Sequence, residues 1–276
     1  MLRKIIIIFI FITGLIVFTY PVVTNWFNSE KHYRVMSKHN ETLQQMSEEA
    51  IENERKKAEE HNNAIDETSI PITDPFSSTD EANEQTGYYD VLNIAETMGR
   101  IEIPSIRVNL PIYHGISDDV LQQGIGHMSN SSFPIGGKGT HTALTGHRGL
   151  PSSKLFRDLD KVKDGDVFFI HTLGETLAYE VDSVKIVLPD ETNWLSIKED
   201  KDYVTLITCE PYMINTHRLL VRGERIPYEK GAAVKEKVER ESKEKNLNVL
   251  YIGICVTIVL FIVVIAYRKM NVKLST

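Results

Sequence analysis

Cysteine is nearly absent from this chain of 276 residues, which contains only Cys209 and Cys255. Cys255 falls in an apolar run near the C-terminus, whereas Cys209 falls in the polar middle of the sequence, so the two are not expected to pair within one chain. Taken alone, a single cysteine is most often a small buried hydrophobic residue. A free thiol outside the cytoplasm is nevertheless exposed to oxidation, so its presence there needs a reason.

Three further absences narrow the class of protein. No stretch concentrates lysine and arginine without interleaved acids, and the formal net charge is −7, so no nucleic-acid partner is expected. No cluster of histidine, cysteine and carboxylates has the spacing of metal ligands, and neither a metal nor another cofactor is expected. Nothing repeats at a fixed period, which argues against a solenoid. The length suits one catalytic-sized domain with appendages.

Two charge-free apolar runs lie near the ends of the chain. Residues 5–23 follow two basic residues and lack the small-residue pattern of a cleavage site, which favours an uncleaved membrane anchor over a signal peptide. Residues 249–267 precede Arg268 and Lys269, which are typical of the cytoplasmic flank of a membrane helix. Both termini are therefore expected in the cytoplasm and the middle of the chain outside it, although basic residues within 235–245 weaken this inference.

Between these runs the chain changes character twice. Residues 28–67 are rich in Glu, Lys, Asn and Gln, with apolar positions at helical spacing, which predicts one long, weakly amphipathic helix or two. Three histidines of this segment, His32, His39 and His61, are expected to be solvated. Residues 68–87 carry prolines with many Ser, Thr and Asp residues and are expected to form a loop.

Beyond residue 98, short β-branched runs alternate with Gly and Pro. This pattern predicts a mainly β fold, a closed or nearly closed β-barrel, with one short helical stretch near residues 153–159. The predicted strands are "RIEIPSI", "VNLPIYHG", "THTALTGHRG", "DVFFIHT", "LAYEVDSVKIVLP", "YVTLITC" and "HRLLVRGERI".

Cys209 ends one predicted strand, and Arg218 lies at the start of the next. If the two strands are neighbours, these residues lie close together. A thiolate nucleophile forms at neutral pH only beside a cation or a base. Arg218 stays protonated, so it would bind a carbonyl oxygen or stabilise developing negative charge, unless it is a solvated surface residue.

The base is expected to be a histidine. His147 lies between Gly146 and Gly149 at the end of an apolar run, in a turn that would expose its side chain. Spacing alone does not choose between His147 and three other candidates. These are His114, His127 and His141.

The segments "TALTGHRG", "TLITC" and "HRLLVRG" together resemble the sortases, Gram-positive transpeptidases that join surface proteins to the cell wall or to one another. The resemblance covers residues 98–227. Carried over by position, it implies that His147 is the catalytic histidine, Cys209 the nucleophile and Arg218 the catalytic arginine.

Further segments are similar to class C, the pilus-assembling sortases: "GHRGLPSSKLF", "CEPYMINTHRLLVRGERI" and "TDPF". The last resembles that class's lid, and implies that Asp74 meets Arg218 while Phe76, after Pro75, covers Cys209. Without the family, "TDPF" is an ordinary turn.

One residue departs from the class C pattern. Glu210 stands where that class more often has a small polar residue after the cysteine. A carboxylate next to a thiol is expected to raise the pKa of the thiol.

The resemblance also implies a reaction. Cys209 attacks the Thr-Gly carbonyl of a Leu-Pro-x-Thr-Gly-like sorting signal while His147 protonates the leaving amine. A lysine of the next pilin then releases the thioacyl enzyme as an isopeptide. The expected partners are pilin subunits and the lipid bilayer.

Three alternatives remain. One is a wall-anchoring sortase of another class. The second is a secreted hydrolytic cysteine peptidase, although papain-like chains carry the cysteine before the histidine. The third is a membrane-tethered adhesin without catalysis, which would leave Cys209 without a purpose.

The expected domain organisation has six parts. They are an N-terminal membrane anchor or signal segment (1–27), a helical segment with the lid loop (28–97), a sortase β-barrel (98–228), a charged juxtamembrane linker (229–247), a C-terminal transmembrane helix (248–268) and a cytoplasmic tail (269–276).

Overall fold

The computed structural model describes residues 2–65, 74–76, 87–150, 153–191 and 193–239. The chain divides into two compact units, Met1–Ala232 and Ala233–Thr276. The described part of the second unit, residues 233–239, is helical. All helices and strands named below belong to the first unit.

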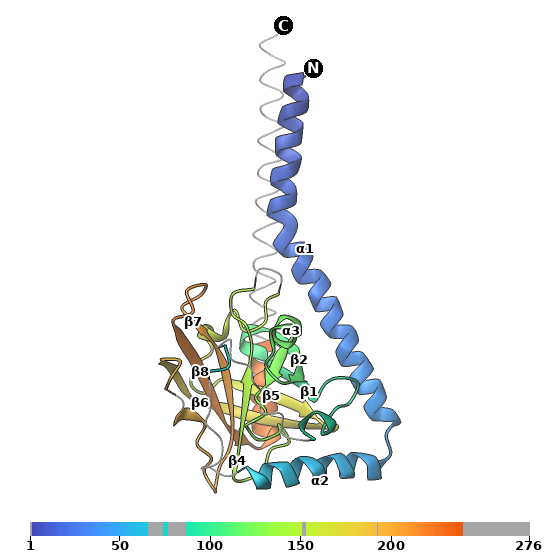
Figure 1. Ribbon diagram of the computed structural model, residues 1–276, viewed down its shortest axis with the longest axis vertical. Coiled ribbons are helices and arrows are strands. Elements are labelled where there is room, and N and C mark those ends of the chain that lie inside the picture. Colours follow the sequence, from blue (N-terminus) through green and yellow to red (C-terminus); the bar gives the residue numbers. More distant parts are fainter. Residues whose placement is uncertain (1, 66–73, 77–86, 151–152, 192, 240–276) are drawn as a thin grey trace. The chain divides into compact units, whose positions relative to one another are not determined.

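A closed β-barrel forms the centre of the first unit (Figure 1). Around the barrel the strands follow the order β1-β2-β3-β4-β7-β8-β6-β5. Their bounds are β1 Gly99–Ile103, β2 Val108–His114, β3 Ile125–His127, β4 Thr140–Thr145, β5 Val167–Thr172, β6 Glu175–Val187, β7 Asp202–Glu210 and β8 His217–Ile226. The predicted mainly β, closed barrel is therefore confirmed, and each of the predicted strands overlaps an observed one.

Short elements around residues 118–161 differ from the sequence prediction. The three-residue strand β3 was not predicted; it is a strand because it pairs with β2 on one side and β4 on the other. The helix α3 (Asp118–Gln123) was also missed, although Ser117 caps it and two acidic residues open its first turn. The stretch expected to be helical near residues 153–159 consists mainly of turns, followed by the 3₁₀-helix η3 (Leu159–Lys161).

The parallel pair β4 and β7 is buried over almost its whole length. Every residue of β4 is buried, and β7 is buried from Tyr203 to Cys209. The pairing runs from Thr140↔Asp202 to Thr145↔Ile207. Parallel strands covered on both faces are typical of a sheet interior. His147, just after β4, and Cys209, near the end of β7, therefore lie next to this well-packed pair of strands.

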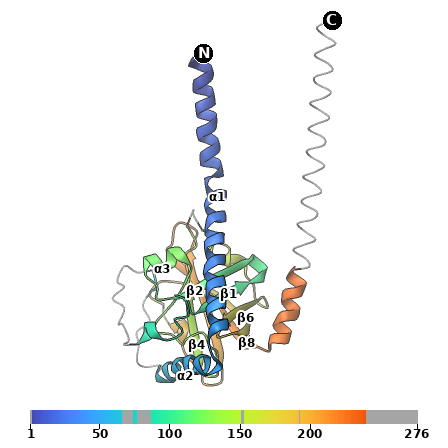
Figure 2. The ribbon, with the colours of Figure 1, turned by 90° about the vertical axis from the view of Figure 1, so that its right-hand side faces the viewer.

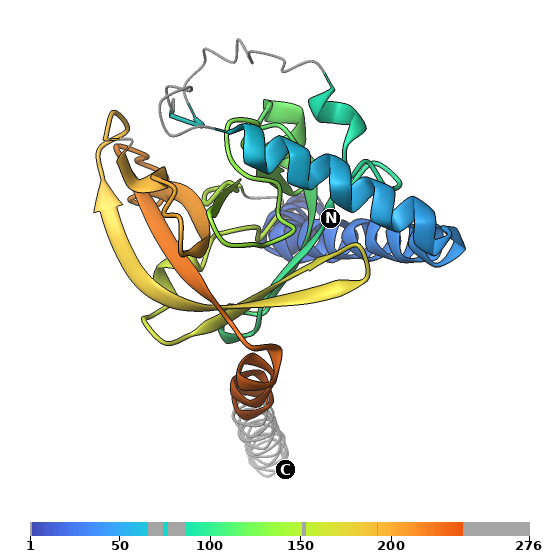
Figure 3. The ribbon, with the colours of Figure 1, turned by 90° about the horizontal axis from the view of Figure 1, so that it is seen from below.

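Two helices precede the barrel, as predicted: α1 (Leu2–Gln45) and α2 (Glu48–Ala64). Ser47 separates them, because its side chain caps α2 by accepting a hydrogen bond from the backbone N–H of Ala50 at 3.1 Å. Figure 2 shows α1 running past β1 and β2, and Figure 3 shows α2 from below.

The prediction that His32, His39 and His61 are solvated is wrong. His32 and His39 are buried and donate to the carbonyls of Gln123 and Ile94, each at 2.9 Å. His61 is half-buried, with its ring 4.5 Å from that of Phe133. Burial lowers the pKa of all three histidines. These histidines are buried because α1 and α2 pack on the barrel, which covers the helix faces that carry them.

The two apolar runs of the sequence relate differently to the described residues. Residues 5–23 fall within α1. Residues 249–267 lie outside the described residues. Across the part of the chain that the structure describes, no helix combines the length and apolar character of a membrane-crossing segment.

Asn62 fastens the end of α2 to the barrel. Its side-chain amide accepts from the backbone N–H of Phe133 at 2.7 Å and donates to the carbonyl of the same residue at 3.3 Å. Asn62 is 6% exposed, and its amide oxygen is the hydrogen-bond partner of the buried Phe133 N–H. The Phe133 carbonyl also accepts from the Ile135 N–H at 2.8 Å and from the Thr142 hydroxyl at 3.4 Å.

The substitution Asn62→Ala should therefore destabilise the protein by about 1–3 kcal/mol, the cost of leaving buried polar groups unsatisfied. Urea unfolding of the full-length protein measures this change. The matched control is Asn63→Ala, because Asn63 is exposed on the same helix. If both variants unfold at the same urea concentration, the amide contact with Phe133 contributes nothing.

Candidate active site

The β7–β8 hairpin brings Cys209 and Arg218 together. The strands are antiparallel, and their register places Cys209 directly opposite Arg218. Residues 211–216 form the connection between them. The two positions singled out by the sequence are thus adjacent at the loop end of the hairpin.

Asp74 forms a bidentate ion pair with Arg218. The Nε and Nη2 atoms of Arg218 donate to the two carboxylate oxygens of Asp74, each at 2.6 Å. The remaining nitrogen, Nη1, donates to the carbonyls of Asn215 and His217 at 3.0 and 2.9 Å. The side chains of Arg218 and Asp74 are only 8% and 13% exposed. All three guanidinium nitrogens are therefore occupied in this closed arrangement.

Phe76 packs between the histidine and the arginine. Its ring centroid lies 5.7 Å from that of His147, and the guanidinium carbon of Arg218 lies 5.1 Å from the Phe76 ring, within cation–π range. Phe76 also packs on a buried apolar cluster of Met128, Ala143, Leu195, Ile207 and Leu220. Pro75, between the two contacting residues, is buried.

Asp74, Pro75 and Phe76 are called the lid residues below. They lie between segments 66–73 and 77–86, which are outside the described residues. The Phe76 N–H donates to Asp74 Oδ1 at 3.4 Å, so the segment also has the local hydrogen bond of a turn. The ordinary-turn interpretation of "TDPF" is thus correct locally, but it omits the contacts with Arg218 and His147.

The Cys209 thiol is buried, with an exposed fraction of 6%. Burial raises the pKa of Cys209 to about 11. Nearby charges act in both directions: Arg218 and Arg148 lower this pKa, whereas Asp74 raises it. At neutral pH the thiol is therefore protonated in the closed arrangement.

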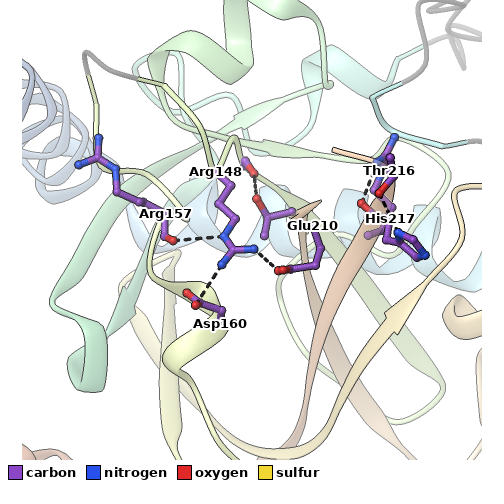
Figure 4. A network of polar contacts seen from close by, with 9 residues as sticks. Arg148, Arg157, Asp160, Glu210, Thr216 and His217 are labelled. Atoms are coloured by element: carbon purple, nitrogen blue, oxygen red, sulfur yellow. Dashed lines mark hydrogen bonds and ion pairs between the residues drawn. The ribbon is translucent and has the colours of Figure 1, made fainter. Parts of the chain in front are cut away.

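The expected effect of Glu210 on this thiol is not observed. Glu210 follows Cys209, but its carboxylate bonds to the guanidinium of Arg148 (Figure 4). The carboxylate that raises the pKa of Cys209 is Asp74. The sequence shows the proximity of Glu210 but not the direction in which its side chain points.

His147 follows β4 in a tightly packed turn. The N–H of Gly146 donates to the carbonyl of Ile207 at 3.1 Å, and the Thr208 hydroxyl donates to the Gly146 carbonyl at 2.7 Å. A Cβ atom at Gly146 would lie 2.7 Å from the Ile125 side chain and 2.8 Å from the Phe156 ring, so a larger residue would require both side chains to shift. Burial lowers the pKa of His147, while the charge of Asp118 raises it. A neutral imidazole is thus favoured at neutral pH.

The other candidate histidines have structural hydrogen bonds within the fold. His114 donates to the carbonyl of Val91 at 2.7 Å. His127 lies 2.8 Å from the Tyr88 hydroxyl, and burial lowers its pKa to about 3. His141 contacts the Thr205 hydroxyl at 2.7 Å, and burial lowers its pKa to about 4. Of the four candidates, His147 is the one whose ring contacts Phe76 of the lid.

Arg148 is a buried residue that the sequence reasoning missed. It is 6% exposed, and beyond Glu210 its guanidinium also contacts Asp160, with Nη2 3.0 Å from Oδ2 (Figure 4). A sequence signal existed: a cation directly follows His147 and an anion directly follows Cys209. Within the described residues, no three or more potential metal-binding side chains are grouped together.

Comparisons with known proteins agree with this geometry. The sortase domain family model matches residues 101–226. The crystal structure of Streptococcus pneumoniae sortase C is 43% identical, with a TM-score of 0.65 over 71% of this chain and 97% of that chain. Sortase C-1 of Actinomyces oris is 47% identical, with a TM-score of 0.61 over 64% of this chain and 99% of that chain.

A curated relative gives a more distant match. Sortase D of Bacillus subtilis (strain 168) is 29% identical over 153 residues, which are 54% of this chain and 73% of that protein. The match of the family model to the barrel, and the near-complete coverage of sortase C structures at more than 40% identity, show that this chain belongs to the sortase family.

Proposed function

We propose that this protein is a pilus-assembling cysteine transpeptidase of the sortase C type. It cleaves a Leu-Pro-x-Thr-Gly-like sorting signal and joins pilin subunits through a lysine isopeptide bond. The observation that carries the proposal is the pairing of Cys209 with Arg218 beneath the lid residues. The structural similarity to Streptococcus pneumoniae sortase C, a protein with pilin substrates, supports the choice of substrate.

The first half-reaction transfers an acyl group to Cys209. His147, neutral at rest, takes the proton of the Cys209 thiol as the sulfur bonds to the carbonyl carbon of the threonine. The bond from that carbon to the glycine nitrogen then breaks, and His147 gives this proton to the leaving amine. Arg218 donates hydrogen bonds to the carbonyl oxygen as negative charge develops on it. A thioacyl enzyme results.

The second half-reaction releases this intermediate. The ε-amine of a pilin lysine attacks the thioester carbonyl, the carbon–sulfur bond breaks, and His147 takes the proton that the amine loses. A hydrolytic peptidase would use water in place of the lysine. The two activities therefore share the first intermediate and differ in their product.

Lid opening would couple substrate access to activation of the thiol. In the closed arrangement burial and Asp74 raise the pKa of Cys209, and Asp74 occupies Arg218. Departure of Asp74 and Phe76 removes one negative charge, admits water and frees the guanidinium. Each of these changes favours a thiolate beside an available oxyanion donor.

We further propose that the barrel works outside the cytoplasm at the cell membrane. The two apolar runs, residues 5–23 and 249–267, and the basic residues beside each of them support this localisation. The domain boundaries expected from the sequence follow the same scheme, with the catalytic barrel at residues 98–228 between two anchors.

The assignment of the nucleophile predicts that Cys209→Ala abolishes thioester formation and leaves the fold intact. Mass spectrometry of the full-length protein with a sorting peptide should show an acyl adduct in the wild type only. Adding an amine acceptor should convert this adduct into an amide, which distinguishes transfer from hydrolysis. An adduct that persists in the variant would assign the nucleophile elsewhere.

The proposed role of Arg218 requires a guanidinium group that can donate two hydrogen bonds in one plane, as well as a positive charge. Arg218→Lys should therefore lower turnover by about 100-fold or more, the typical effect of losing an oxyanion donor. Steady-state peptide cleavage measures the change. The control is Arg222→Lys on the same strand, because Arg222 pairs with Asp182. If both variants retain the wild-type rate, Arg218 has no role in the reaction.

The lid contacts predict that removing them exposes the thiol. The double variant Asp74→Ala/Phe76→Ala loses contacts worth on the order of 1–3 kcal/mol, so the open fraction should rise roughly 5- to 150-fold. A bulky thiol reagent should label Cys209 correspondingly faster, as peptide mass spectrometry can measure.

The control for the lid variant is Asp182→Ala, which breaks the Asp182–Arg222 pair and leaves the lid residues unchanged. Equal labelling rates in the wild type and the lid variant would mean that the three lid residues do not restrict access to Cys209.

A further inference from the structure

A buried arginine and a half-buried glutamate lie next in sequence to the two proposed reacting residues. Arg148 follows His147, and Glu210 follows Cys209. The Nη1 atom of Arg148 donates to Oε2 of Glu210. The pair therefore joins the chain just after the imidazole to the chain just after the thiol, as Figure 4 shows for Arg148 and Glu210.

The guanidinium of Arg148 is held from three sides. Besides Glu210, it contacts Asp160 Oδ2 at 3.0 Å through Nη2, and its Nε donates to the carbonyl of Arg157 at 3.4 Å. The side chain of Arg148 is 7% exposed and that of Glu210 19% exposed. The planar guanidinium group has donors on three nitrogens and can reach these two carboxylates and the carbonyl at once, whereas the single ammonium group of a lysine would reach fewer of them.

The pair lies where the strand pairing ends. The β4–β7 ladder ends at Thr145↔Ile207, and the N–H of Gly146 adds a last backbone bond to the carbonyl of Ile207. Beyond this point the side-chain pair Arg148–Glu210 links the two chain segments. It extends the connection between β4 and β7 into the part of the chain that carries the reacting groups.

We propose that Arg148 is a positioning residue of the acyl transfer: through its ion pair with Glu210 it fixes the imidazole-bearing segment against the thiol-bearing segment. The same pair turns the Glu210 carboxylate toward Arg148 and away from the thiol. This inference rests on the proposed function, since it assigns a role within the same reaction.

The electrostatics of the site agree with this role. The charges that act on Cys209 are those of Arg218, Asp74 and Arg148, and Arg148 lowers the pKa of the thiol. The charge that acts on His147 is that of Asp118. Loss of Arg148 would remove one cation and release one carboxylate next to the thiol. Both changes raise the pKa of the thiol.

Four full-length variants test the inference: Arg148→Met, Glu210→Gln, the two combined, and Arg222→Met as the matched control. Arg222 is also paired with a carboxylate, through two hydrogen bonds to Asp182. Two quantities are measured for each folded variant. They are kcat and KM for a sorting peptide with an amine acceptor, and the pH midpoint of Cys209 alkylation by iodoacetamide, followed by peptide mass spectrometry.

Arg148→Met should lower kcat by roughly 10- to 100-fold, as a small displacement of reacting groups does, with little change in KM. Its alkylation midpoint should move upward by about one pH unit, because the freed carboxylate opposes the thiolate. Adding Glu210→Gln should return the midpoint toward the wild-type value and leave kcat low, since the connection is still broken. Arg222→Met should change neither quantity.

A folded Arg148→Met protein with the wild-type kcat and midpoint would overturn the inference, and so would equal losses in Arg148→Met and Arg222→Met. If Arg148→Met does not fold, Glu210→Gln decides: a several-fold lower kcat without a raised midpoint supports the role, and a wild-type kcat refutes it.

The alkylation measurement needs no peptide. A wild-type protein that forms no thioacyl adduct would therefore contradict the proposed function, while the midpoints would still test the inference.

Discussion

The ion pair between Asp74 and Arg218 determines the state of the whole site. Two hydrogen bonds of 2.6 Å occupy the guanidinium face that the proposed reaction needs for the substrate carbonyl. The same contact holds Phe76 against the His147 ring. Its carboxylate also raises the pKa of the buried thiol. One interaction thus occupies the proposed oxyanion donor, covers the His147 ring and keeps the proposed nucleophile protonated.

The rest of the fold holds the lid residues within reach of Arg218. Asn62 fastens the end of α2 to Phe133 before the lid residues, and Tyr88 contacts His127 and the N–H of Gly115 after them. Both anchor points rest on the barrel. The pairing of β7 with β8 fixes the position of Arg218, because it places Arg218 opposite Cys209. The Asp74–Arg218 ion pair therefore joins the lid residues to a buried residue of β8.

Much of this arrangement could be predicted from the sequence, and several of the failures concern contacts between distant segments. The alternating β-branched runs indicated the barrel. The resemblance of three segments to the sortases indicated His147, Cys209 and Arg218 as the candidate site, a choice that the spacing of the histidines alone did not make. The burial of His32 and His39 could not be predicted, because it depends on α1 packing against distant carbonyls. The orientation of Glu210 toward Arg148 likewise depends on the parallel pairing of β4 with β7. Local patterns carry no information about such contacts between distant segments.

In the proposed reaction, Asp74 and the substrate compete for Arg218. The most direct measurement is the equilibrium affinity of a sorting peptide for the non-reacting Cys209→Ala protein, with Asp74 present and with Asp74→Ala. A charge-assisted contact of about 1.5–3 kcal/mol should be lost when the peptide binds, so the Asp74→Ala protein should bind the peptide about tenfold more tightly or better. Equal affinities for the two proteins would show that the Asp74–Arg218 ion pair does not compete with the peptide for its site.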